Sequence, residues 1–185
     1  MRKILTKVTG MAALASLSVP AFAQEAVEAA PAVANPGNNA WMMTATILVL
    51  LMILPGLALF YGGLTRTKNM LSTMTQIGAA ACLAMLIWVM YGYGLAFGPE
   101  GNAFISWGKF FLAGVDSSST AATFSDEVIS EYVFISFQMT FAAITLALVL
   151  GSVVERMKFS AVMVFGAVWL TIVYFPIAHM VWAGG

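Results

Sequence analysis

The sequence predicts an all-α membrane protein with four transmembrane helices. Hydrophobic residues make up 61% of the 185 residues and charged residues only 9%, whereas soluble proteins carry about 25% charged residues. Four stretches contain no charged residue, and each exceeds the roughly 20 residues that a helix needs to cross the hydrocarbon core. These stretches are 40–65, 69–99, 132–154 and 159–185. They lack the alternation of apolar and polar residues that a transmembrane β-barrel would require.

The first 23 residues have the pattern of a secretory signal peptide. Arg2, Lys3 and Lys7 precede a short apolar run, and Ala21-Phe22-Ala23 supplies small residues for cleavage. An uncleaved anchor helix is the alternative, although the run is short for a membrane span. Residues 24–39 are rich in Ala, Pro, Glu and Asn, which predicts a flexible periplasmic leader.

Residues 40–185 predict a single membrane domain whose orientation follows from its basic residues. The expected helices lie near 41–64, 73–97, 132–154 and 159–181. Arg66 and Arg156 lie in the two short connections, which should face the cytoplasm because cytoplasmic loops retain Lys and Arg. Glu155 and Arg156 are expected to form an ion pair there. The long, acidic connection 98–131 then lies outside, on the side of the mature N-terminus.

The first and second spans carry features with structural explanations. Pro55 and Gly56 interrupt the first span, and they predict a kink packed against a neighbouring helix, because Pro removes a hydrogen bond and Gly permits close approach. Aromatic residues gather toward the outer end of the second span, where an interfacial aromatic belt is expected. They are Trp88, Tyr91, Tyr93 and Phe97.

The third span carries a polar residue within an aromatic face. Phe137, Gln138 and Phe141 recur at helical spacing, together with Phe134 and Thr145. An amide in hydrocarbon is costly unless it is paired, so Gln138 should face protein or water. Two interpretations stay open: an interhelical hydrogen bond with the phenylalanines as packing, or an outer vestibule in which Phe137 and Phe141 present π faces to a small cation.

The chain's single histidine, His179, lies near the end of the fourth span. An ionisable residue in a membrane segment is usually functional, so a pore or proton-relay role competes with a structural one. No group of His, Cys or carboxylate residues has metal-ligand spacing, and no catalytic motif is visible. We therefore expect no metal, no cofactor and no enzymatic activity, and the lack of a basic run argues against nucleic acid as a partner.

Four blocks of the sequence resemble the ammonium transporter family, in the family's order. They are PGLALFYGGLTRTKN (55–69), WVMYGYGLAFG (88–98), FQMTFAAIT (137–145) and ERMKFSA (155–161). The resemblance implies a fold of roughly eleven helices, built as two inverted halves around a pore. The present chain would contain four of these helices, preceded by the signal peptide.

The resemblance also implies a site. In the family, ammonium is recruited at an outer site of aromatic rings and passes stacked phenylalanines into an apolar pore that contains two histidines. Phe137 and Trp182 match the outer-site aromatics, and Phe141 matches both that site and the pore gate. His179 matches neither pore histidine, which favours a structural role with its ring hydrogen-bonded to a neighbouring helix.

The family implies partners and a location as well. Ammonium or ammonia would be the substrate, for nitrogen acquisition, and the lipid bilayer of a bacterial inner membrane the surroundings. A homotrimer and a PII-type signalling protein are the implied protein partners. With about four of roughly eleven helices, the chain alone is expected to be inactive. An ammonium sensor with a fused cytoplasmic output domain is the alternative, and a membrane hydrolase or haem protein using His179 is a weaker one.

Overall fold

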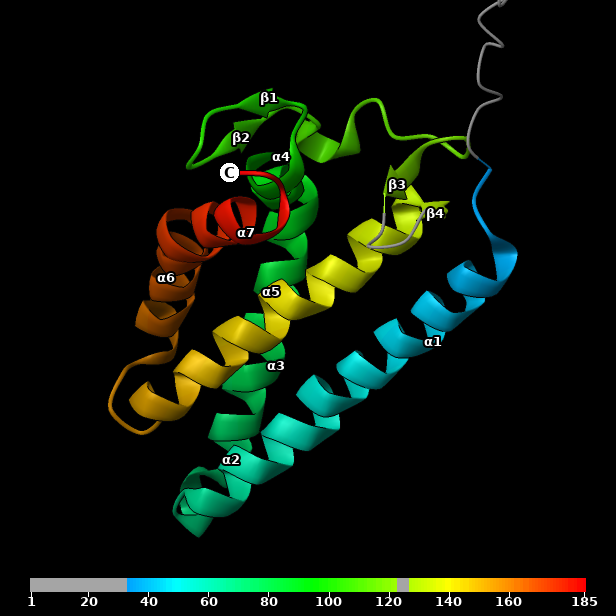
Figure 1. Ribbon diagram of the computed structural model, residues 1–185. Helices are drawn as coiled ribbons and strands as arrows, with labels where there is room; N and C mark the ends of the chain where they lie inside the picture. Colours follow the sequence, from blue (N-terminus) through cyan, green and yellow to red (C-terminus); the bar gives the residue numbers. More distant parts are fainter. Residues whose placement is uncertain (1–32, 123–126) are drawn as a thin grey trace, which may run out of the picture. The chain divides into compact units, whose positions relative to one another are not determined.

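The computed structural model describes residues 33–122 and 127–185 (Figure 1). Within these residues, four helices are long and apolar enough to cross a membrane. They are Pro36–Leu64, Thr67–Phe97, Glu131–Val153 and Phe159–Trp182. This confirms the predicted all-α membrane fold with four spanning helices. The predicted signal peptide, 1–23, and residues 24–32 of the predicted leader lie outside the described residues.

The first span begins earlier than the sequence predicted. Its first helix, α1 (Pro36–Leu51), includes residues that were assigned to the leader. The side chain of Asn35 accepts a hydrogen bond from the backbone N–H of Asn38 at 3.0 Å, and Pro36 occupies the start of the helix, where its missing N–H costs nothing. The backbone N–H of Asn35 also donates to the carbonyl of Val128 at 3.0 Å. This start is therefore fixed by a cap and by a long-range hydrogen bond.

Pro55 lies in a π-helical turn, η1 (Met52–Leu57), between α1 and α2 (Ala58–Leu64). A π turn contains one more residue than an α turn, and such a turn accommodates a residue that cannot donate a backbone hydrogen bond. Gly56 follows Pro55 within the turn, and a Cβ added there would lie 3.3 Å from the carbonyl oxygen of Leu51. The helix thus passes through the Pro-Gly pair by widening locally.

The second span is the most buried of the four. It consists of η2 (Thr67–Asn69), α3 (Met70–Ile87), a π-helical turn η3 (Trp88–Gly92) and α4 (Tyr93–Phe97). Ala80, Ala81 and Ala84 are fully buried on α3, which allows the neighbouring helices to approach closely. α3 packs against both α5 and α6 (Figure 1).

The long connection between the second and third spans contains short strands that the sequence analysis did not predict. β1 (Glu100–Gly101) pairs with β2 (Ser106–Trp107) in an antiparallel hairpin. β3 (Thr120–Ala122) pairs antiparallel with β4 (Val128–Ser130), with Thr120 opposite Ser130. A short 3-10 turn, η4 (Phe110–Leu112), lies between the two hairpins.

The third span is the single helix α5 (Glu131–Val153), which packs against α1 and α3. The fourth span consists of α6 (Phe159–Trp169), a π-helical turn η5 (Leu170–Tyr174) and α7 (Phe175–Trp182). α7 packs against α4, at the end of the bundle where β1 and β2 lie (Figure 1).

The connection between α5 and α6 corrects one expectation. Glu155 does not pair with Arg156; its Oε1 accepts from Arg66 Nε at 3.2 Å and from Asn69 Nδ2 at 2.6 Å. Arg156 instead donates to the carbonyl of Ser152 at 3.4 Å. The Asn69 amide, followed by the Arg66 side chain, lowers the pKa of the Glu155 carboxyl below its ordinary value. Glu155 thereby joins two loops that are far apart in the sequence.

Close packing between η3 and α7 generates a prediction. A Cβ added to Gly92 would lie 2.5 Å from Cζ of Phe175, whose side chain is fully buried. We expect Gly92→Ala to destabilise the protein by about 1–3 kcal/mol through overpacking, measured as a lower midpoint of thermal unfolding in detergent. The control is Gly78→Ala in α3, where a Cβ meets nothing within 4 Å. Equal midpoints for the two variants would contradict close packing of Gly92 against Phe175.

Candidate functional site

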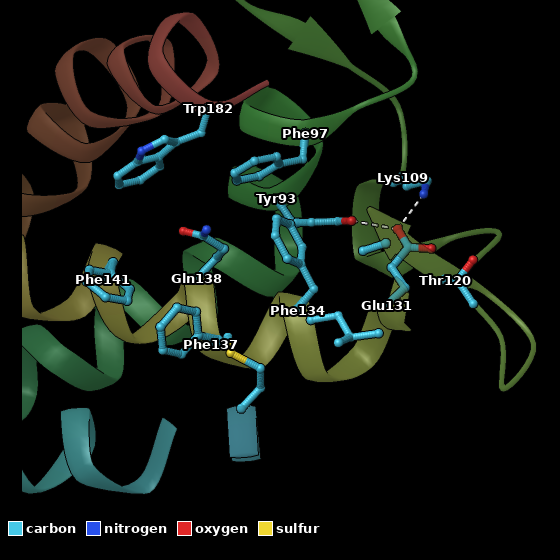
Figure 2. Close-up of a pocket in the computed structure, with 13 residues that line it drawn as sticks. Tyr93, Phe97, Lys109, Thr120, Glu131, Phe134, Phe137, Gln138, Phe141 and Trp182 are labelled. Carbon is cyan, nitrogen blue, oxygen red and sulfur yellow. Dashed lines mark hydrogen bonds and ion pairs between the residues drawn. The ribbon is translucent and has the colours of Figure 1, made fainter. Parts of the chain in front are cut away.

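A cavity of about 710 Å³ lies where α4, α5, the long connection and the end of α7 meet (Figure 2). This volume is typical of small-molecule sites, which range over roughly 300–1,000 Å³. Most of the lining is aromatic or aliphatic, and a few polar groups project into it. The lining residues are Met42, Tyr93, Phe97, Lys109, Thr120, Ala121, Ile129, Glu131, Phe134, Phe137, Gln138, Phe141 and Trp182.

The three residues that the resemblance assigned to an outer site line this cavity together. Phe137 and Phe141 lie one turn apart on α5, with ring centroids 4.9 Å apart and planes inclined at 69°. Trp182, from the end of α7, approaches Phe141 with a centroid distance of 6.4 Å and an angle of 71°. Both pairs have the edge-to-face arrangement that aromatic quadrupoles favour. The structure thus brings two rings of the third span and one of the fourth to the same wall.

Gln138 also lines the cavity (Figure 2). Its Oε1 is buried and has no hydrogen-bond partner among the described residues. The interhelical hydrogen bond considered from the sequence is therefore not made by this oxygen. An unpaired acceptor in an apolar wall is costly, and it suits a ligand that brings its own N–H donors.

Trp88, Tyr93 and Phe97 do not belong to the interfacial belt that the sequence predicted. Trp88 is fully buried and Tyr93 is 3% exposed, whereas belt residues would face lipid headgroups. Trp88 donates from Nε1 to the carbonyl of Ile135 at 3.1 Å. Tyr93 and Phe97 stack with centroids 5.8 Å apart and line the cavity. The local sequence could not separate these cases, because both place aromatic residues at the end of a span.

The polar end of the cavity, formed by Glu131 and Lys109, was not predicted from the sequence. Glu131, the first residue of α5, is 4% exposed. Its Oε1 accepts a hydrogen bond from the Tyr93 hydroxyl at 2.5 Å and forms an ion pair with Lys109 Nζ (Figure 2). The Lys109 Nζ also lies 5.9 Å from the centroid of the Tyr93 ring. Lys109 and Glu131 lie 22 residues apart, and no local pattern of the sequence pairs them.

His179 does not line the cavity. Its ring lies between two backbone carbonyls, with Nδ1 2.9 Å from the oxygen of Ala96 and Nε2 2.9 Å from that of Asn102. A neutral imidazole carries one N–H, so it donates to one of these carbonyls at a time. The ring thus contacts both α4 and the loop of the β1–β2 hairpin and hydrogen-bonds one of them, and its structural role stays a prediction. A haem iron would find neither ring nitrogen free.

The described residues contain no group of three or more His, Cys, Asp or Glu that could hold a metal ion. The fold and cavity define a multi-pass membrane protein with an aromatic site at one end of its helices. Residues 40–185 match the Ammonium Transporter Family, and the chain belongs to that family.

Individual relatives show the same likeness. An ammonium transporter of Aquifex aeolicus is 42% identical over 151 residues, which cover 82% of this chain and 35% of that protein. An ammonium transporter of Bacillus subtilis is 41% identical over 152 residues, covering 80% of this chain and 36% of that protein. The chain thus spans about a third of the length of these relatives.

Solved structures share the fold. The crystal structure of Candida albicans Mep2 aligns with a TM-score of 0.69 and 32% identity, over 82% of this chain and 32% of that one. Saccharomyces cerevisiae Mep2 gives 0.68 and 35% identity, over 81% and 34% of the two chains. A structure named Sensor Amt Protein aligns with a TM-score of 0.67 at 24% identity, over 78% and 34%, a likeness of fold alone.

The hydrogen bonds of His179 generate the second prediction. We expect His179→Leu to lower the thermal unfolding midpoint in detergent, by the equivalent of about 1–3 kcal/mol, because a buried carbonyl loses its donor. The matched control is Met180→Leu, a volume-conserving change at an exposed position of the same helix. If the two variants unfold at the same temperature, the ring does not hold α7 in place.

Proposed function

We propose that this chain is the N-terminal part of a transporter that carries ammonium or ammonia across a bacterial inner membrane for nitrogen acquisition. The observation that carries the proposal is the wall of Phe137, Phe141 and Trp182 in one cavity, in a chain of the ammonium transporter family. Lipid surrounds the spanning helices, and the mature N-terminus is periplasmic. Residues 1–23 are then a signal peptide and residues 24–35 a short leader.

The cavity recruits the cation before it crosses the membrane. A ring face attracts a desolvated cation by about 0.5–2 kcal/mol, and it does not attract neutral ammonia in this way. Ammonium also brings four N–H donors, which suits the unpartnered Oε1 of Gln138 beside the rings. Together, the rings supply attraction for positive charge and the amide oxygen supplies a directional contact. This combination favours ammonium over an alkali cation of similar size, which cannot donate hydrogen bonds.

Phe141 serves as both a wall of this site and one ring of the pore gate. It contacts Phe137 on one side and Trp182 on the other, so it lies at the centre of the aromatic wall. A hydrated ion cannot pass a closed apolar constriction without losing its water, which is costly. Transfer of one proton from ammonium to a pore histidine of the complete protein, as the family resemblance implies, would let nitrogen continue as ammonia while other cations are rejected.

The complete protein is proposed to be a homotrimer, and its cytoplasmic face a docking site for a PII-type signalling protein. The loops that contain Arg66 and Arg156 face the cytoplasm in this orientation, and the hairpins of the long connection lie in the periplasm. Both assignments follow the distribution of basic and acidic residues along the chain.

An ammonium sensor is the second candidate, because a structure named Sensor Amt Protein has the same fold. A sensor would use the cavity to bind ammonium and would pass the signal to a fused cytoplasmic output domain. Ammonium uptake by the full-length protein separates the two functions, since a sensor needs binding without substantial flux.

The aromatic wall generates the third prediction. In the full-length transporter that contains this segment, we expect Phe141→Ala and Trp182→Leu each to reduce methylammonium uptake or to weaken exclusion of potassium. Loss of a desolvated ring should weaken cation binding by about 2 kcal/mol, or roughly thirtyfold. Phe159→Ala, at an exposed position on α6, is the control. Uptake kinetics and potassium exclusion that match the unaltered protein in both cavity variants would refute the assignment.

The length of the matched region generates the fourth prediction. The chain spans about a third of its relatives, and substrate paths of such transporters lie between two inverted halves. We therefore expect residues 24–185 alone, reconstituted in liposomes, to take up no methylammonium above empty liposomes. A full-length relative reconstituted at the same density is the positive control. Saturable uptake by the segment would overturn this prediction.

A further inference from the structure

At the polar end of the cavity, the Glu131 carboxylate binds an alkylammonium group of the protein itself, the head group of Lys109. Lys109 and Glu131 are the charged residues among the described residues that line the cavity. The Glu131 side chain is 5% exposed and that of Lys109 26% exposed. The Lys109 head group pairs with the carboxylate and lies 5.9 Å from the centre of the Tyr93 ring. A carboxylate beside an aromatic ring is the chemistry that recognises small ammonium cations.

We propose that Glu131 and Tyr93 form a second ammonium site, which the side chain of Lys109 occupies until a free ammonium or small primary alkylammonium ion replaces it. This site deepens the proposed function, on which it rests for its substrate, and it is distinct from the wall of Phe137, Phe141 and Trp182. Methylammonium presents the same head group as lysine without the tether, so it can make the same contacts.

The two partners differ in exposure and in the elements that hold them, which makes exchange possible. Glu131 is held at the start of α5, and its carboxylate also accepts the Tyr93 hydroxyl at 2.5 Å. Lys109 lies on the long connection, in the left-handed backbone region at φ 49°, and its side chain is partly exposed. Its four-carbon stem can carry the head group toward solvent while the carboxylate stays in place.

Electrostatics couples the departure of Lys109 to the arrival of a cation. A buried carboxylate without a partner is strongly destabilising, so Glu131 favours replacement of one ammonium by another over remaining bare. An ion held at Glu131 is already inside the cavity that contains the aromatic wall (Figure 2). It can therefore reach the rings without returning to solvent, while Lys109 re-forms its ion pair behind it.

The competing explanation is a purely structural ion pair that fastens the long connection onto α5. The two explanations predict different effects for the variants that remove one partner of the pair. A structural pair predicts that loss of either partner impairs the protein in the same direction. An exchange site predicts opposite effects on cation affinity, because Lys109→Met leaves a vacant anion in the cavity whereas Glu131→Gln leaves an unpaired cation there.

Thermal unfolding of the purified full-length transporter in detergent tests cation binding without transport. Lys109→Met should lower the unfolding midpoint in sodium chloride, and ammonium or methylammonium chloride at equal ionic strength should restore much of the loss. Lys109→Met/Glu131→Gln, which has no charged site, should show no such rescue. A Lys109→Met midpoint that is the same in ammonium chloride as in sodium chloride, or the same ammonium effect in the double variant, would overturn the proposal. Because this measurement needs no flux, it stands or falls separately from the transport function.

Methylammonium uptake by the full-length transporter provides the second measurement. We expect the half-saturation concentration to fall for Lys109→Met and to rise on the order of tenfold for Glu131→Gln, with the double variant between them. Glu100→Gln, an exposed carboxylate on the same connection, is the control and should match the unaltered protein. If Lys109→Met does not fold, recovery of affinity from Glu131→Gln to the double variant still supports the charge effect. Changes in the same direction for both single variants, or no recovery in the double variant, would overturn it.

Discussion

Burial of Trp88 is the interaction on which the arrangement of the helices depends. The indole is fully buried and donates to the carbonyl of Ile135 on α5. Its ring also lies 5.9 Å from that of Phe175 on α7 and 5.9 Å from that of Tyr93 on α4. One side chain thus contacts the three helices that carry most of the cavity wall. In a bilayer, where lipid offers no hydrophobic force between helices, close packing and such hydrogen bonds decide how spans associate.

The cavity that results has two ends with different chemistry. At one end, Phe141 lies between Phe137 and Trp182, beside the unpaired oxygen of Gln138. At the other, the Glu131 carboxylate is held by Tyr93 and Lys109. In the function proposed above, a small cation is first attracted by charge and then loses its water before it enters an apolar path. The ammonium transporter family to which the chain belongs gives this arrangement its proposed substrate.

Several features of the site followed from the sequence because their signals are local. The spacing of Phe137, Gln138 and Phe141 places them on one helical face wherever the helix packs. The assignments that failed concerned partners. Glu155 binds Arg66 and Asn69 instead of its neighbour Arg156, and the aromatic residues around Trp88 face the core instead of the membrane interface. Each of these outcomes depends on which helix or loop lies opposite the residue. The sequence pattern within one span does not indicate that neighbour.

The sequence by itself determined the four spans, because the length and apolarity of a segment decide whether it can cross hydrocarbon. It also determined the family, through blocks of residues that stand in order along the chain. Only the tertiary structure decided that Lys109 meets Glu131 across 22 residues, and that His179 meets Ala96 across 83. The physical reason is that a buried charge or ring nitrogen is satisfied by whatever group the packing of distant helices brings within reach.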